Sequence, residues 1–387
     1  MAKTIEEMLK NEQRTLTMRG TLTFADGHEE ILAPQDIIEA AFSEGVTDGL
    51  LLGAVLCSDA HIKLANADGQ WSAGGTRRGE RSMAGAKITL FLTASADGGT
   101  AETPFHTFYV KKAACPLRGA VTLSGGSGFP PLFSAQYTDA VQYPASVGTL
   151  VKALVQAGGG TLKSETFSGA ERMVLRAPDF SRLTVRQALS MALTAVGCFL
   201  IVDENGLCDV RPVRADGTPA EIDSAQVLSL DAPTIAFGPL SALKIEPKEG
   251  ESRLLGDENA QSAAYLLTVS QNPLLEYADG EDALANNLFK ALQGMTLSSG
   301  SLTVRGGAYP LGTALSVPDR LGTRSCLPVT DRQMTFRHGS LQTVVSCRVS
   351  SAQTGLTLVG GTPAVSGSIN GQNLLSGSVQ GLSLIHI

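Results

Sequence analysis

The chain has 387 residues, enough for roughly two to four domains, and 42 glycines with only 5% aromatics favour many tight turns and small β-units. Its formal net charge of −7, with 30 Lys and Arg, excludes tight sequence-independent binding to nucleic acid phosphates. Six scattered cysteines without a CxxC pair exclude zinc-ligand spacing, and no apolar run is long enough to span a bilayer. We therefore expect a protein made in the cytoplasm, with buried free thiols and no membrane span.

The first range, 1–133, carries strand patterns behind a short helix. A capping box of Thr4 and Glu7 predicts a helix that runs through Lys10. Alternating apolar residues then predict strands at 15–24, 29–32, 51–55, 62–64, 86–93 and 105–111, the first two forming a hairpin. The segment 123–132, LSGGSGFPPL, predicts a domain boundary at which no strand continues.

The second range, 134–235, has the pattern of an α/β module with two helices and a hairpin. Ser146 is the expected cap of the first helix, which carries an apolar stripe and ends at 158–160. A capping box of Thr184 and Gln187 predicts the second helix, which stops at Gly197. Two strands then follow across Asn205-Gly206, a dipeptide that favours a type I′ turn.

The third range, 236–352, predicts strands again, together with one helix at 281–293 whose apolar face repeats every fourth residue. Its last part, 302–350, reads as an antiparallel meander with successive turn signals, among them Pro318-Asp319 and His338-Gly339. These patterns predict the half of a β-barrel or β-sandwich.

The Gly/Ser-rich range 353–381 predicts the start of a β-fibre or a flexible linker, because Ser366-Gly367-Ser368-Ile369 recurs as Ser376-Gly377-Ser378-Val379. Two copies leave both interpretations open. The last six residues, 382–387 or LSLIHI, break this repeat and are what a transposase-end sequencing adapter would encode. We hypothesise that they are foreign and that the genuine protein continues past Gly381.

Motifs that would indicate catalysis are missing, since the sequence holds no HExxH, GxSxG or phosphate loop. Cys57 and His61 would share a face only on a helix, whereas their flanks predict strand and turn. The run 203–205 lacks calcium-loop spacing and favours a plain turn. The basic run 77–81 has no interleaved aromatics, which favours a solvated or intersubunit loop over a nucleic-acid patch. We therefore assign no catalytic, cofactor-binding or metal-binding residue and expect no enzyme and no cofactor.

Five segments, in this order, resemble phage tail hub proteins, a group that includes baseplate hubs and the N-terminal part of tail-associated proteins. They are Asp36-Ile37-Ile38 with Leu52-Gly53-Ala54, then FHTFYV, then LTVRQALSMALTAVGCFLIVDENGLCDVRP, then Asn272-Pro273-Leu274 before a helix, and lastly PLGTALSVPDRLGTRSCLPVTDRQMTFRHGSLQTVVSC. The strand FHTFYV lacks the glycine of the family pattern. The resemblance covers about 1–352.

This resemblance implies an α+β fold, mainly β, with tube-like β-barrels in 1–133 and 236–352 and the α/β module inserted between them. It implies a structural protein of the virion tail tip: a homotrimer whose ring continues the tail tube and lets DNA pass without tight binding. The implied partners are the distal tail and tail tube proteins, the tape-measure protein, and a downstream spike or fibre for host attachment. Two alternatives stay open: the front of a cell-wall hydrolase whose catalytic domain lies past the end of this sequence, and a receptor-binding adhesin.

Overall fold

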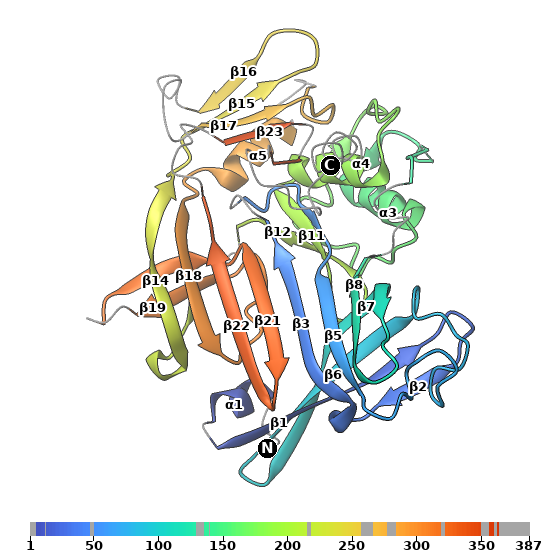
Figure 1. Cartoon of the computed structure of the whole chain (residues 1–387). Coiled ribbons are helices and arrows are strands. Elements are labelled where there is room, and N and C mark those ends of the chain that lie inside the picture. Colours follow the sequence, from blue (N-terminus) through green and yellow to red (C-terminus); the bar gives the residue numbers. More distant parts are fainter. Residues whose placement is uncertain are drawn as a thin grey trace, which may run out of the picture.

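A computed structural model of the chain describes residues 5–11, 13–46, 50–128, 135–138, 140–214, 218–256, 266–276, 284–318, 322–349, 356–359 and 362–363. Its main feature is an eleven-stranded antiparallel sheet with the order β14-β18-β22-β21-β3-β5-β8-β7-β6-β1-β2 (Figure 1). The bounds are β1 (Arg14–Thr23), β2 (Glu29–Leu32), β3 (Ile37–Gly45), β5 (Asp59–Asn66), β6 (Lys87–Ala96), β7 (Gly99–Ala114), β8 (Gly119–Gly126), β14 (Val227–Phe237), β18 (Leu297–Arg305), β21 (Asp331–Arg337) and β22 (Ser340–Cys347). The mainly β character predicted from the sequence is confirmed.

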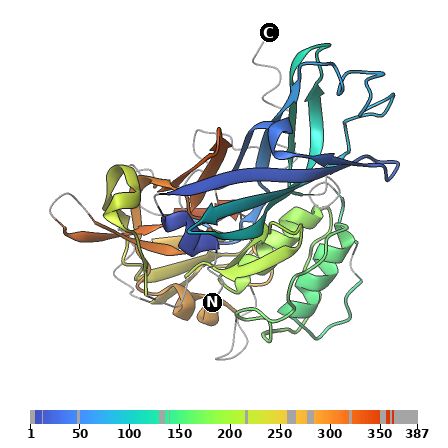
Figure 2. The same ribbon diagram turned by 90° about the horizontal axis from the view of Figure 1, so that it is seen from below.

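The sheet curls around the lower of two hydrophobic cores. In the view from below, the dark blue ribbon of β1 crosses the lower end of the molecule (Figure 2). There it approaches the turn between β21 and β22, since a Cβ atom added to Gly339 would lie 3.4 Å from the Leu16 carbonyl oxygen. A short helix, α1 (Ile5–Lys10), contributes Met8 and Leu9 to this core.

Closed barrels, which were predicted from the sequence, are not seen among the described residues. Barrel closure requires hydrogen bonds between the first and last strands of a sheet. The end strands here are β14 and β2, and in the described part of the chain each pairs on one side only, with β18 and β1 respectively. The large sheet is therefore open.

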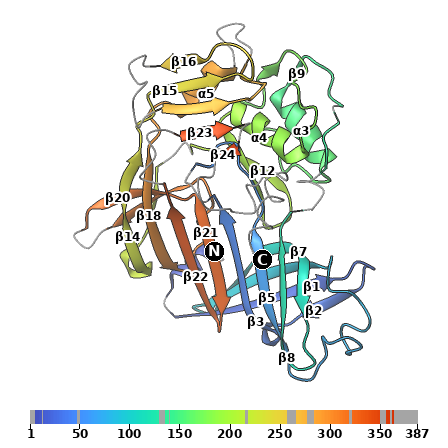
Figure 3. The ribbon, with the colours of Figure 1, turned by 45° about the horizontal axis from the view of Figure 1, so that its top comes forward.

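Within the described ranges, four smaller sheets and three further helices accompany the large sheet. The sheets are β12-β11-β4, β13-β19-β20, β16-β15-β17-β23-β24 and β10-β9. Their strands are β4 (Val55–Leu56), β9 (Ala145–Ser146), β10 (Met173–Val174), β11 (Cys198–Val202), β12 (Cys208–Pro212), β13 (Ala220–Glu221), β15 (Ala242–Glu246), β16 (Arg253–Gly256), β17 (Leu266–Ser270), β19 (Ala314–Pro318), β20 (Arg324–Pro328), β23 (Leu356–Val359) and β24 (Thr362–Pro363). Two 3₁₀ turns lie at η1 (Pro34–Asp36) and η2 (Ser224–Gln226). The helices are α3 (Val147–Ala157), α4 (Val185–Ala195) and α5 (Leu284–Leu292), and α4 contacts the other two (Figure 3).

The helix predictions for the α/β module are confirmed by their caps. The Ser146 hydroxyl accepts a hydrogen bond from the Thr149 backbone N–H at the start of α3. Thr184 and Gln187 form the expected capping box at the start of α4. The apolar stripes of both helices are buried in the upper core, where α3 contacts α4 and α4 packs against β11. None of the described helices is long and apolar enough to cross a membrane.

The expectation that no strand continues through 123–132 is wrong for the first part of this segment. Strand β8 continues to Gly126 and pairs with both β5 and β7. Glycine does not interrupt it because two strands approach closely here: a Cβ atom on Gly125 would lie 1.8 Å from the Tyr109 carbonyl oxygen. The residues at 129–132 lie outside the described ranges.

Strand pairing also corrects the predicted meander in 302–350. Strand β18 pairs with β22, while β19 and β20 leave the large sheet and form a hairpin of their own with β13. The two-residue turn at His338-Gly339 joins β21 to β22, and both residues have positive φ, as a type I′ turn requires. At the other predicted hairpin only Gly206 has positive φ, so the type I′ prediction for Asn205-Gly206 is wrong.

Two further observations concern the predicted ranges. Strands from 1–133 and 236–352 share one sheet, through the pairing of β3 with β21. Strand β23, from the Gly/Ser-rich range, pairs in parallel with β17. The division into ranges stays a prediction, and the repeat after residue 365 and the last six residues lie outside the described residues.

Candidate functional site

The basic run 77–81 belongs to a loop that connects β5 to β6 and folds over the indole of Trp71. This side chain is fully buried, and the Arg77 guanidinium carbon lies 4.2 Å from the centre of its ring. The Trp71 backbone N–H donates to the Asn66 side-chain oxygen at 2.8 Å, which holds the start of the loop against the end of β5. The aromatic partner of Arg77 thus lies six residues before it, outside the basic run itself.

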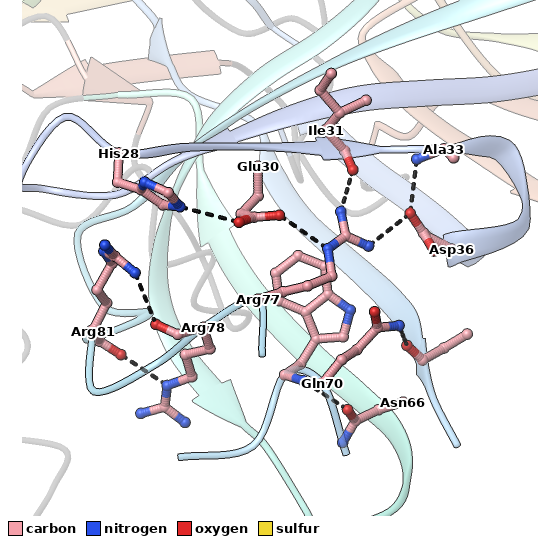
Figure 4. A network of polar contacts seen from close by, with 12 residues as sticks. His28, Glu30, Ile31, Ala33, Asp36, Asn66, Gln70, Arg77, Arg78 and Arg81 are labelled. Atoms are coloured by element: carbon pink, nitrogen blue, oxygen red, sulfur yellow. Dashed lines mark hydrogen bonds and ion pairs between the residues drawn. The ribbon is translucent and has the colours of Figure 1, made fainter. Parts of the chain in front are cut away.

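The Arg77 guanidinium joins the loop to the edge of the large sheet (Figure 4). Its Nε lies 3.0 Å from a carboxylate oxygen of Glu30, and its Nη1 lies 2.9 Å from one of Asp36. Its Nη2 donates to the backbone oxygen of Ile31 on β2. A backbone oxygen at the free edge of a sheet is a position where another strand could pair. Arg77 therefore caps this edge.

The other two arginines of the run are also held within the chain. The Arg81 Nε lies 2.9 Å from Asp26, in a pair that is exposed to solvent. The Arg78 Nε donates to the Arg81 backbone oxygen at 2.8 Å. The loop is thus built around intramolecular partners for its cations.

Cys57 and His61, the closest approach to a metal or thiol motif in the sequence, belong to different segments: one follows β4, and the other lies on β5 of the large sheet. Cys57 follows β4, and burial raises the pKa of its thiol to about 12, so it is protonated at neutral pH. His61 lies on β5 and its Nδ1 is 3.9 Å from Glu39. Among the described residues no cluster of three His, Cys, Asp or Glu side chains has the geometry to hold a metal ion.

In the turn at 203–205, which lacks calcium-loop spacing, the Asp203 carboxylate pairs with a lysine side chain of the same chain. One Asp203 carboxylate oxygen accepts hydrogen bonds from the backbone N–H groups of Asn205 and Leu207, both at 2.9 Å. Its other oxygen lies 3.1 Å from the Lys163 ammonium. The hydrogen bond to Asp203 raises the pKa of Lys163, so the lysine stays charged and neutralises the carboxylate.

A serine–histidine pair that the sequence did not reveal lies in the lower core. The Ser58 hydroxyl oxygen is 2.6 Å from His106 Nε2, and the imidazole stacks on Phe42 with ring centres 4.4 Å apart. Such a pair can activate a nucleophile when substrate reaches it. Here Ser58 is 1% exposed and His106 4% exposed, so the pair is part of the core. The two residues are 48 positions apart, which no local motif detects.

Burial makes His106 sensitive to acid. Burial, followed by the nearby charge of Arg332, lowers the pKa of His106 from 6.5 to about 3. Below pH 6.5 the unfolded chain binds a proton that the folded chain excludes, so stability falls as the pH falls, by about 2 kcal/mol at pH 5. We expect His106→Gln to reduce the difference in free energy of unfolding between pH 7 and pH 5, measured by urea denaturation. An unchanged difference would contradict this role for the imidazole.

Comparison with known proteins gives matches in structure only. No family model matches the sequence, and no curated protein matches it. The 43 kDa tail protein of prophage MuSo2 from Shewanella oneidensis is 13% identical, with a TM-score of 0.51 over 86% of this chain and 98% of that one. The tail protein of Neisseria meningitidis is 16% identical, with a TM-score of 0.51 over 88% of this chain and 99% of that one.

A third solved structure shows a similar degree of likeness to this chain. The prophage tail protein gp18 of Listeria monocytogenes is 11% identical, with a TM-score of 0.52 over 86% of this chain and 95% of that one. At these identities the likeness concerns the fold, and it spans almost the whole of each of the three proteins. This chain has the fold of these phage tail proteins.

Proposed function

We propose that the chain is a structural protein of a phage tail, the hub of the baseplate or tail tip. Three copies form a ring that continues the tail tube, lets DNA pass and carries a spike or fibre for host attachment. Its further partners are the distal tail and tail tube proteins and the tape-measure protein. The observation that carries the proposal is the fold likeness over 86% of this chain and 98% of the MuSo2 tail protein.

The two edge strands of the large sheet, β2 and β14, differ in a way that favours assembly through β14. Strand β2 is short and capped by Arg77. Strand β14 has eleven residues, of which only Phe237 is buried, and in the described part of the chain it pairs with β18 alone. Its Ile235 is 73% exposed and its Leu228 48% exposed. A long, uncapped edge strand with exposed apolar side chains favours contact with another chain.

In the proposed ring, β14 of each copy contacts the next copy through a head-to-tail interface, which closes when the rotation between copies is one third of a turn. The barrel walls predicted from the sequence are then completed between copies, because each copy contributes an open sheet. The role requires interfaces and no catalytic group.

The solution mass tests the ring. Light scattering after size exclusion, at two protein concentrations, should give three times the chain mass of 40.3 kDa. Ile235→Asp should reduce this to the mass of one chain, since a carboxylate would be placed in an apolar contact. The matched control is Ile31→Asp on the capped edge, where isoleucine is 71% exposed, and it should leave the trimer intact. A wild-type monomer at both concentrations would contradict self-assembly, and a trimeric Ile235→Asp variant would exclude β14 as the contact.

A further inference from the structure

The outer face of the large sheet carries a band of positive charge, although the chain as a whole is acidic. Register places one row of residues across seven strands: Arg305, Gln342, Thr335, Ala41, His61, Ser124 and Lys112. The row beside it contains Ser340, Arg337, Glu39, Lys63 and Thr122. Directly paired residues of an antiparallel sheet point to the same face. These rows lie on the face away from the lower core, because the alternating residues Phe42, Ile62 and Phe336 are buried in it.

We call the cations of these two rows the cationic strip: Arg305, Arg337, His61, Lys63 and Lys112. Four of them carry a formal charge at pH 7, and the only carboxylate in the two rows is Glu39. Its oxygens lie 3.2 Å from Lys63 and 3.8 Å from Arg337. Within the described residues, neither Arg305 nor Lys112 has an ion pair. The strip therefore has a surplus of three positive charges in a chain whose net charge is −7.

Like charge also gathers at one end of the strip. Burial, followed by the charge of Arg305, lowers the pKa of Arg14 on β1. Two guanidinium groups near each other raise the local positive potential, which favours an anionic partner.

The residues between the cations indicate the kind of partner. Apart from Glu39, they are Ser, Thr, Gln and Ala, without one aromatic or large apolar side chain. A protein interface has an apolar or aromatic centre, and binding of single-stranded nucleic acid uses aromatic rings on which bases stack. Hydroxyl, amide and cationic groups alone suit phosphate and sugar oxygens. The cations recur on β18, β21, β5 and β7, every second strand, so neighbouring positions are roughly 10 Å apart along the sheet.

We propose that the cationic strip contacts the phosphate backbone of double-stranded DNA, weakly and without regard to sequence. The inference rests on the proposed tail role, in which the chain borders a passage for DNA. It assigns that border to the polar face of β18, β22, β21, β3, β5 and β8. Contact through about four phosphates gives an affinity that depends steeply on salt, and DNA is released as the salt concentration rises.

The test is binding of a 30-base-pair duplex by the full chain, measured by fluorescence anisotropy between 50 and 200 mM salt, about the range over which such contacts weaken strongly. The strip variant carries Arg305→Gln, Arg337→Gln, Lys63→Gln and Lys112→Gln. The control variant carries Arg118→Gln, Lys152→Gln, Lys248→Gln and Lys290→Gln, which removes the same charge from exposed or half-exposed positions outside the two rows. We expect the wild type and the control to bind with a slope of log affinity against log salt of about −3.6, and the strip variant to bind at least tenfold more weakly with a slope near zero.

Three results would overturn the inference: no binding by the wild type at 50 mM salt, equal losses in both variants, or equal wild-type affinity for duplex and poly-glutamate. The last would assign the strip to an acidic protein surface. The molecular mass of the wild type and of each variant is also measured by light scattering. A monomeric wild type that retains strip-dependent DNA binding would contradict the proposed ring and support the proposed DNA contact. A trimer without DNA binding would support the ring and contradict the DNA contact.

Discussion

Arg77→Met is expected to lower the free energy of unfolding by about 3 kcal/mol, measured by urea denaturation at pH 7. The guanidinium lies 3.0 Å from Glu30 and 2.9 Å from Asp36, and all three side chains are mostly buried. Methionine would keep the packing on Trp71 and leave two shielded carboxylates without their cation. Breaking a buried ion pair at one partner has a large effect because the remaining charge cannot recover its hydration.

The matched control is Arg81→Met in the same loop. Its ion pair with Asp26 has almost the same length, 2.9 Å, but both side chains are much more exposed. Water replaces the lost partner of an exposed carboxylate, so we expect a loss of less than about 1 kcal/mol. Equal losses in the two variants would contradict the assignment of Arg77 as the residue that fixes the loop to the edge of β2.

Uncapping β2 has a second expected effect, on association. Without Arg77 the Ile31 backbone oxygen becomes available to another strand. The Arg77→Met variant should form higher oligomers at protein concentrations where Arg81→Met gives the wild-type mass. This readout separates the cap from a purely stabilising contact.

Local signals in the sequence predicted the starts of α3 and α4 and the turn between β21 and β22 correctly. The cap at Ser146 and the capping box of Thr184 and Gln187 are short-range patterns, and both helices begin where these patterns place them. The turn at His338-Gly339 likewise joins two paired strands. Such features depend on a few neighbouring residues and need no knowledge of the rest of the fold.

Strand pairing between residues that are far apart in the sequence could not be predicted from local signals. The pairing of β21 with β3 brings Arg332 to Glu44, 288 positions earlier, and no local pattern records this contact. The openness of the large sheet depends on the same distant pairings, which explains why the sequence suggested barrels. The cationic strip could not be predicted for a related reason: its members are scattered from His61 to Arg337 and form two neighbouring rows only after the register is fixed.

Gly125 is the glycine of the large sheet at which adding a single methyl group is expected to destabilise strand pairing most. A Cβ atom there would lie 1.8 Å from the Tyr109 carbonyl oxygen, far inside contact distance, and the obstacle is backbone that cannot rotate away. Gly125→Ala should therefore separate β7 from β8 and lower the free energy of unfolding by about 3 kcal/mol.

Gly99, at the start of the neighbouring strand β7, offers the matched control. A Cβ atom there would lie 3.2 Å from the terminal carbon of Met8, which sits at the far end of a flexible side chain and can move aside. Gly99→Ala should change the free energy of unfolding by less than about 1 kcal/mol. A mild Gly125→Ala variant, with the wild-type midpoint in urea, would mean that β8 does not continue through Gly125 and Gly126. The predicted domain boundary at 123–132 would then regain its support.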